Sequence, residues 1–140
     1  MDPIFRLPPR SPLTAAVSDD WGLLPLRVPM GWNVIYNTLL ARRLPDGRVE
    51  VSDSEDLYRA RTARPPWLTA QEAASRGGLQ AREINIDAGW YQGCGFRIVV
   101  LDPDWDHEHA SHITSDLGEF VTTLEGWTRL ITERGELSKA

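Results

Sequence analysis

The stretch that decides the fold is residues 84–101, which read INIDAGWYQGCGFRIVVL. Ile84 and Ile86 point to one side of an extended chain and Asn85 and Asp87 to the other, which is the alternation of a half-buried strand. Glycines follow, and after them comes a run of consecutive apolar residues typical of a central strand covered on both faces. We therefore expect a β-hairpin at the centre of an antiparallel sheet.

The turn of this hairpin is flanked by Gly89, Gly93 and Gly95, and residues 96–101 form its returning strand. A second hairpin is expected over residues 32–52. Its first strand carries aromatic and β-branched residues at alternate positions, and its turn is the sequence Pro-Asp-Gly at 45–47. The alternating residues are Trp32, Val34, Tyr36, Thr38 and Leu40.

Two shorter strands complete the expected sheet. Residues 57–61 alternate in the same way and end before two prolines. Residues 26–28 lie between Pro25 and Pro29, so they have room only for a short edge strand.

The C-terminal segment predicts a long amphipathic helix. Thr114 or Ser115 can cap its start, Asp116 complements the helix dipole there, and Gly135 ends it. The sequence therefore predicts an α+β fold, an antiparallel sheet of four to six strands with this helix packed on one face. Its apolar residues follow the spacing of one helix face: Leu117, Phe120, Val121, Leu124, Trp127, Leu130 and Ile131.

A chain of 140 residues suits a single domain. Residues 1–13 contain four prolines and are expected to form an extended arm, with the α+β domain over residues 14–140. Residues 62–79 are interpreted as an insertion with a short helix that Thr69 caps.

Composition narrows the classes of function. A net charge of −5 and a pI near 5.1 disfavour nucleic-acid binding, which needs a basic face. No apolar run approaches the roughly 20 residues of a membrane helix, and the start lacks the apolar stretch of a signal peptide. Cys94 is the single cysteine, so an intrachain disulfide is impossible. We expect a cytoplasmic protein that binds neither nucleic acid nor membrane.

The richest polar run is residues 102–112, which contains His107, His109 and His112. This spacing resembles metallo-β-lactamase-like hydrolases, but Ser111 stands where that family has aspartate and no histidine follows. The run also fails the calcium-loop pattern, which needs glycine at position six and glutamate at position twelve. Three interpretations remain open: a solvated connection between the last strand and the helix, a zinc or manganese site, and a loop for a protein partner.

No other residues form a catalytic constellation. Cys94 lies between two glycines with no signature of a nucleophile around it. Most of the six tryptophans must be core, with Trp32 and Trp127 inside, whereas Trp90 and Trp105 lie in turn-like contexts. We therefore predict no catalytic residue, no metal site and no cofactor.

Four short segments together resemble small bacterial immunity proteins, which are encoded beside polymorphic or contact-dependent toxins and neutralise them by binding. The resemblance covers about residues 21–132 and implies a class of function without any site residues. The segments are Gly31-Trp32-Asn33-Val34-Ile35-Tyr36-Asn37, Ser54-Glu55-Asp56-Leu57, Ile86-Asp87-Ala88-Gly89-Trp90-Tyr91 and Glu125-Gly126-Trp127.

The leading hypothesis is an immunity-type protein that binds a cognate toxin or effector and occludes its active site. A basic enzyme would be drawn to an acidic inhibitor. The alternatives are a metal-dependent hydrolase that uses residues 102–112 and a non-catalytic adaptor domain. The predicted partner-binding residues are Trp90, Tyr91, Asp104, Trp105, Asp106 and Glu108.

Overall fold

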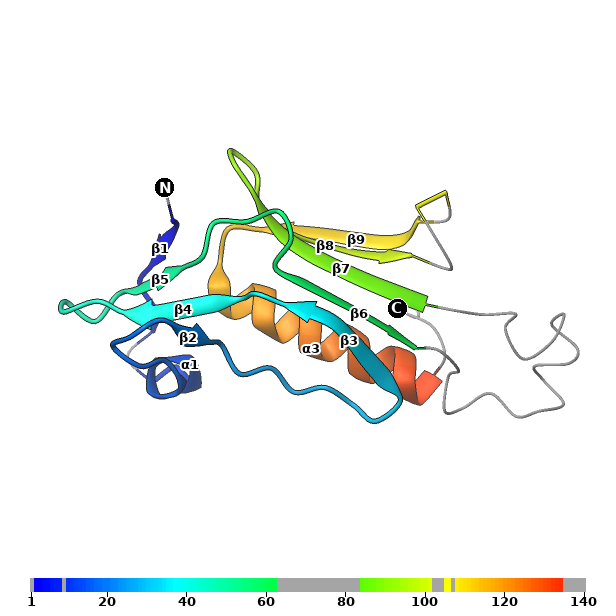
Figure 1. Ribbon diagram of the computed structural model, residues 1–140, viewed down its shortest axis with the longest axis horizontal. Coiled ribbons are helices and arrows are strands. Elements are labelled where there is room, and N and C mark those ends of the chain that lie inside the picture. Colours follow the sequence, from blue (N-terminus) through cyan, green and yellow to red (C-terminus); the bar gives the residue numbers. More distant parts are fainter. Residues whose placement is uncertain (1, 9, 63–83, 102–104, 107, 135–140) are drawn as a thin grey trace, which may run out of the picture.

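The computed structural model describes residues 2–8, 10–62, 84–101, 105–106 and 108–134. In these ranges the strands form two antiparallel sheets, of four and five strands, against which a C-terminal helix packs (Figure 1). The predicted α+β fold is confirmed, with the strands divided between two sheets. The elements are β1 (Ile4–Phe5), α1 (Pro12–Ala16), β2 (Gly22–Leu23), β3 (Trp32–Asn37), β4 (Leu40–Arg43), β5 (Val49–Val51), β6 (Tyr58–Thr62), β7 (Ile84–Tyr91), β8 (Gly95–Leu101), β9 (Glu108–Thr114) and α3 (Leu117–Arg134).

The larger sheet has the strand order β3-β6-β7-β8-β9. The predicted central hairpin is confirmed as β7 and β8, in which Ile86 lies opposite Val100 and Trp90 opposite Phe96. Helix α3 covers the apolar face, where the ring of Phe120 stacks on that of Phe96 with centroids 4.2 Å apart. Both phenylalanines are fully buried, so this pair joins the helix to the sheet.

The smaller sheet has the order β1-β5-β4-β2 and shares the same hydrophobic core. The N-terminal arm is part of it, because β1 pairs with β5 and the ring of Phe5 stacks on Phe96. Residues 12–16 form the short helix α1, which Ser11 caps by accepting the N–H of Leu13. The expectation of an extended arm over residues 1–13 is therefore wrong at residues 12–13, which belong to α1.

The hairpin predicted over residues 32–52 is wrong in its first strand. The true hairpin is β4 with β5, across the predicted turn at 45–47, whereas β3 pairs with β6 in the other sheet. The chain changes sheets at Thr38 and Leu39. There the N–H of Thr38 donates to the carbonyl of Leu57 at 2.7 Å, and the carbonyl of Leu39 accepts from Leu24 at 2.9 Å. The alternation continues across this crossing, so periodicity alone does not reveal it.

Residues 108–114 form a strand that the sequence did not predict. Strand β9 pairs along β8, with Ser111 opposite Val99 and Thr114 opposite Phe96. Polar residues fill this strand because it lies at the edge of the sheet. Residues 102–107 thus connect two strands, and the interpretation of the run as a strand-to-helix connection is wrong.

The start of α3 differs from the prediction by one residue. Asp116 is the cap, because its carboxylate accepts the N–H of Glu119 at 2.8 Å. Thr114 supports this cap by accepting the N–H of Asp116 and donating to the carboxylate of Glu119. Trp32 is buried as predicted and donates to the hydroxyl of Thr132, while Trp127 packs on the core but remains partly exposed.

Two further predictions concern the connections. Residues 26–28 do not form an edge strand but run extended past α3. The strand predicted at 57–61 is confirmed as β6. The insertion predicted at 62–79 lies, apart from Thr62, outside the described residues.

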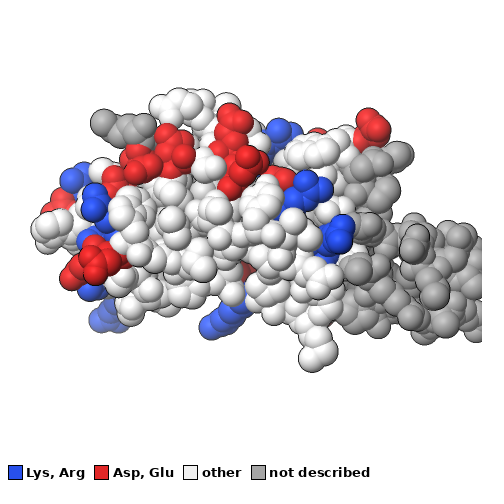
Figure 2. All heavy atoms as spheres, in the orientation of Figure 1, with Lys and Arg blue, Asp and Glu red and all other residues white. Residues whose placement is uncertain are grey.

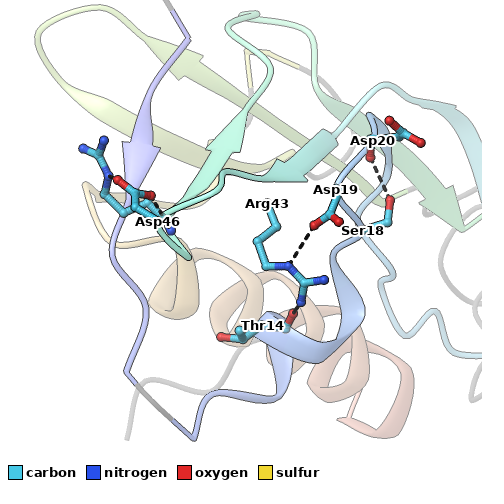
Figure 3. A network of polar contacts seen from close by, with 7 residues as sticks. Thr14, Ser18, Asp19, Asp20, Arg43 and Asp46 are labelled. Carbon is cyan, nitrogen blue, oxygen red and sulfur yellow. Dashed lines mark hydrogen bonds and ion pairs between the residues drawn. The ribbon is translucent and has the colours of Figure 1, made fainter.

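Arg43 holds the N-terminal region against the smaller sheet (Figure 3). Its guanidinium lies between the carboxylate of Asp19, at 3.1 Å, and the carbonyl of Thr14, at 3.4 Å. Its backbone N–H also donates to Ser18. Arg42 pairs with Glu50 at 2.6 Å and lies over the ring of Trp21. These arginines therefore have structural partners.

Candidate functional site

Three segments that are far apart in the sequence meet on the face of the larger sheet opposite α3. The hydroxyl of Tyr36 lies 3.5 Å from Oδ1 of Asp56 and 3.5 Å from Oδ2 of Asp87. These residues come from β3, from the connection between β5 and β6, and from β7. We call Tyr36, Asp56 and Asp87 the tyrosine–carboxylate cluster.

A β-bulge places Tyr36 on this face. The pairing of β3 with β6 shifts between Val34 and Tyr36, so Val34 lies opposite Ala60 and Tyr36 opposite Arg59. Ile35 is the extra residue. Without it Tyr36 would lie on the same face of β3 as Trp32 and Val34, as their simple alternation indicates. Bulges often redirect side chains in this way near functional sites.

Asp56 is positioned by the connection that carries it across β7. The N–H of Leu57 donates to the carbonyl of Ala88 at 3.0 Å, and the N–H of Trp90 donates to the carbonyl of Ser54 at 2.7 Å. This close approach requires Gly89, because a Cβ there would lie 1.9 Å from the carbonyl oxygen of Glu55. Gly89 was expected beside the hairpin turn, but it lies inside β7, beneath this crossing.

The electrostatics of the cluster disfavour negative charge. The side chain of Asp87 is almost wholly buried, and burial raises the pKa of its carboxyl, which Arg59 partly offsets and Asp56 reinforces. Burial, together with the charges of Asp87 and Asp56, raises the pKa of the Tyr36 phenol to about 12. The phenol therefore remains protonated at neutral pH, and its single proton cannot satisfy both carboxylates.

The surrounding polar face extends from Tyr91 to Glu108. Burial, then the charges of Asp87 and Glu55, raises the pKa of Tyr91. Further along, Arg97 lies 3.7 Å from the carboxylate of Glu108. We call these residues and the tyrosine–carboxylate cluster, together with Glu55, Arg59 and Asn85, the polar face. Figure 2 shows acidic side chains gathered in the upper middle of the molecule, where Figure 1 draws the β5–β6 connection.

Chemically, the polar face carries four carboxylates, two phenols and two arginines, so acids outnumber cations. Arg59 lies 3.5 Å from the amide oxygen of Asn85, and the charges of Arg59 and Arg97 lower the pKa of Asp87 without offsetting its burial. Within the described residues, no three histidine, cysteine, aspartate or glutamate side chains are grouped to hold a metal ion. The arrangement fits a guanidinium or ammonium group presented from outside.

The predicted partner-binding residues do not form one patch. Trp90 turns toward the core, where its ring packs edge-on against Phe5 and Phe96, and it is half-buried. Tyr91 points to the opposite side, onto the polar face. Trp105 is 53% exposed and follows the other end of β8 in the chain. Asp106 and Glu108 are exposed beside it, and Asp104 lies outside the described residues.

The metal-dependent alternative gains no support where the chain is described. His112 contacts the carboxylate of Glu119 at 3.0 Å and the ring of Trp127, both of which belong to the helix contact. His109 is exposed, and His107 lies outside the described residues, as do residues 102–104. Cys94 is exposed in the β7–β8 turn.

Sequence reasoning missed Tyr36, Asp56 and Asp87 as site residues, although a signal was present. The signal was that Asp87 alternates with isoleucines, which places it on the non-core side of its strand. What the sequence did not show is that the bulge and the crossing bring the three side chains together.

Comparisons with known proteins add no identification. No family model, no curated protein and no solved structure matches this chain. Among the described residues, the one long helix, α3, is too polar to cross a membrane.

Proposed function

We propose that this protein is an immunity-type inhibitor that neutralises a cognate bacterial toxin or effector by binding it directly and covering its active site. The observation that carries the proposal is the tyrosine–carboxylate cluster on the polar face. The partner is a protein with an exposed arginine or lysine beside a basic cleft. We further propose that it acts in the cytoplasm, where a single free cysteine is ordinary.

Charge in the free protein supports this proposal. Asp56 and Asp87 face one phenol, and the nearby Arg59 leaves the pKa of Asp87 still raised. A partner cation placed between these carboxylates would favour their ionised forms and gain charge-assisted hydrogen bonds. In the free protein the ionised form of Asp87 is thus unfavourable, and a bound cation would stabilise it. Carboxyl groups with a shifted pKa are common at functional sites.

The rest of the polar face fits the same role. Tyr36 and Tyr91 are partly exposed, and tyrosine is among the residues that dominate binding energy at interfaces. The net charge of −5 would speed encounter with a basic enzyme. Of the residues predicted from the sequence, Tyr91 and Glu108 lie on this face, and their role in binding stays a prediction.

The test uses the protein encoded by the gene next to that of this chain. The two are produced together in bacteria, and growth is compared with cells that make the neighbour alone. Binding is then measured with both purified proteins. We expect rescue of growth and a dissociation constant in the nanomolar range, as is typical of inhibitory complexes of standard size.

Two variants connect that binding to the polar face. Asp56→Arg and Asp87→Asn should each weaken binding by tenfold or more, since a charged hydrogen bond contributes about 1.5–3 kcal/mol. The matched control is Asp46→Arg, which reverses an exposed acid in the turn of the other sheet. Absence of any binding would overturn the proposed function. Binding that all three variants leave unchanged would overturn the assignment to the polar face.

A further inference from the structure

An open groove lies on the other side of the molecule, between α3 and the extended segment that precedes β3. Its volume is about 480 Å³, within the range of small-molecule sites. Residues 27–29 form one wall, and one face of α3 forms the other. We call this the α3 groove; its lining residues are Arg27, Val28, Pro29, Thr122, Glu125, Gly126 and Arg129.

The two walls are held at a fixed distance. The carboxylate of Glu125 accepts the backbone N–H of Arg27 at 2.5 Å. This hydrogen bond joins the extended segment to the helix and leaves the carboxylate of Glu125 engaged. The α3 groove is therefore a formed feature of the fold, and the carboxylate of Glu125 in its lining already accepts a hydrogen bond.

Gly126 forms the floor of the α3 groove, where the helix backbone carries no side chain. A Cβ at this position would meet no atom within 4 Å, so packing does not require glycine here. By contrast, a Cβ on Gly118 in the same helix would crowd the capping carboxylate of Asp116 at 3.2 Å. Glycine inside a helix is unfavourable, and one reason to keep it is the close approach of another molecule to the backbone.

Arginines flank this floor. Arg27 is exposed, and among the described residues its guanidinium has no ion-pair partner. Within the described part of the chain, Arg129 pairs with Glu133 at 4.0 Å, between two largely exposed side chains, and such a pair holds it only weakly. The lining of the α3 groove thus carries two arginines and one carboxylate, a formal charge of +1 in a chain that is acidic overall.

We propose that the α3 groove binds a small carboxylate with an apolar body. The apolar part lies against Gly126, Val28 and Pro29, and the carboxylate is held by Arg27 and Arg129. Arginine suits this anion because its planar fork of donors matches a carboxylate. The site is separate from the polar face, so it does not depend on the function proposed above.

The probe is 2-naphthoate, titrated into the full chain labelled with 15N and followed by amide shifts in NMR spectra. We expect saturable shifts at Gly126 and Val28, with a dissociation constant on the order of 1 mM for a ligand of this size. The neutral analogue 2-naphthylmethanol should bind at least threefold more weakly. Equal binding of the two probes would overturn the role of the arginines, and no saturable shift at these amides would overturn the site.

Variants place the ligand within the α3 groove. Gly126→Leu should abolish binding by filling the floor, and Gly126→Ala should weaken it while favouring the helix. Glu133→Leu adds the same side chain about two turns further along α3, outside the lining residues. Because it also removes the partner of Arg129, it should leave binding of the neutral probe unchanged and bind 2-naphthoate at least as tightly. Arg27→Gln and Arg129→Gln should each weaken 2-naphthoate by about three- to tenfold without affecting the neutral probe. Binding that survives Gly126→Leu would overturn the proposal.

Discussion

Replacing Gly89 with alanine tests whether the crossing of the β5–β6 connection builds the tyrosine–carboxylate cluster. The new Cβ would lie 1.9 Å from the carbonyl oxygen of Glu55, whereas ordinary contact begins at 3.4 Å. Both partners are backbone, so neither side can rotate away. The connection must therefore move off β7 by about 1.5 Å.

The size of the effect follows from the contacts that this movement breaks. Two backbone hydrogen bonds hold the crossing: Leu57 to Ala88 at 3.0 Å and Trp90 to Ser54 at 2.7 Å. Each contributes about 1 kcal/mol, so Gly89→Ala should lower the free energy of unfolding by about 2–3 kcal/mol. For a domain of this size that is a fall in Tm of roughly 6–12 °C.

Two measurements follow the stability and the site together. Urea denaturation monitored by tryptophan fluorescence should show the lower midpoint. NMR titration should show the pKa of Tyr36 below about 12 but still above its ordinary value, because Asp56 moves away from the phenol while burial and Asp87 continue to raise the pKa. The matched control is Gly22→Ala, since a Cβ at Gly22 would meet nothing within 4 Å and should leave both quantities unchanged.

Two results would refute this reasoning. If Gly89→Ala unfolds at the same urea concentration as Gly22→Ala, the crossing does not hold the fold together. If stability falls but the pKa of Tyr36 stays near 12, the crossing stabilises the fold without positioning the carboxylate of Asp56. In either case the link between Gly89 and the tyrosine–carboxylate cluster is lost.

The remaining predictions test the core and the charges. Phe120→Ala removes a buried ring stacked on Phe96, so it should lower the free energy of unfolding in urea by about 3–5 kcal/mol. A loss under about 1 kcal/mol would contradict the packing of α3 on the sheet through this pair. Asp87→Asn should stabilise the free protein at pH 7: burial raises the pKa of this carboxyl in the folded state, so ionisation weakens the fold above the unfolded pKa. The gain should vanish below about pH 4, and a gain that is independent of pH would contradict this cause. Reversing Asp104, Asp106 and Glu108 together should slow association with a basic partner and leave the urea midpoint unchanged, because exposed charges such as those of Asp106 and Glu108 contribute little to stability. An unchanged association rate would contradict the predicted role of these three acids in binding.

The sequence predicted the elements whose pattern is local. The β7–β8 hairpin follows from alternation and glycines, and α3 follows from a continuous apolar face. These patterns report which side of an element is buried. They do not report which strands pair, so the exchange of partners between β3 and β4 at Leu39 was missed.

Strand β9 was missed for a different reason. An edge strand has one neighbour and, in this protein, an outer face that meets solvent, so its sequence keeps polar residues at most positions. Its exposed residues include His109, Ser111 and Ile113. Composition then resembles a loop, and only the pairing with β8 identifies the strand.

A single bulged residue, Ile35, is the reason why the candidate site could not be predicted from the sequence. With period-two alternation, Tyr36 belongs on the same face of β3 as Trp32, which is buried. The bulge at Ile35 reverses this assignment and aligns Tyr36 with Arg59, which in turn lies opposite Asp87. A bulge weakens pairing at the edge of a sheet, so it brings no stability that would explain its presence. What it provides is a phenol between two carboxylates on the face opposite α3. The geometry of β3 is therefore better explained by the polar face than by the core, and deleting Ile35 should return Tyr36 to the core side and separate the cluster.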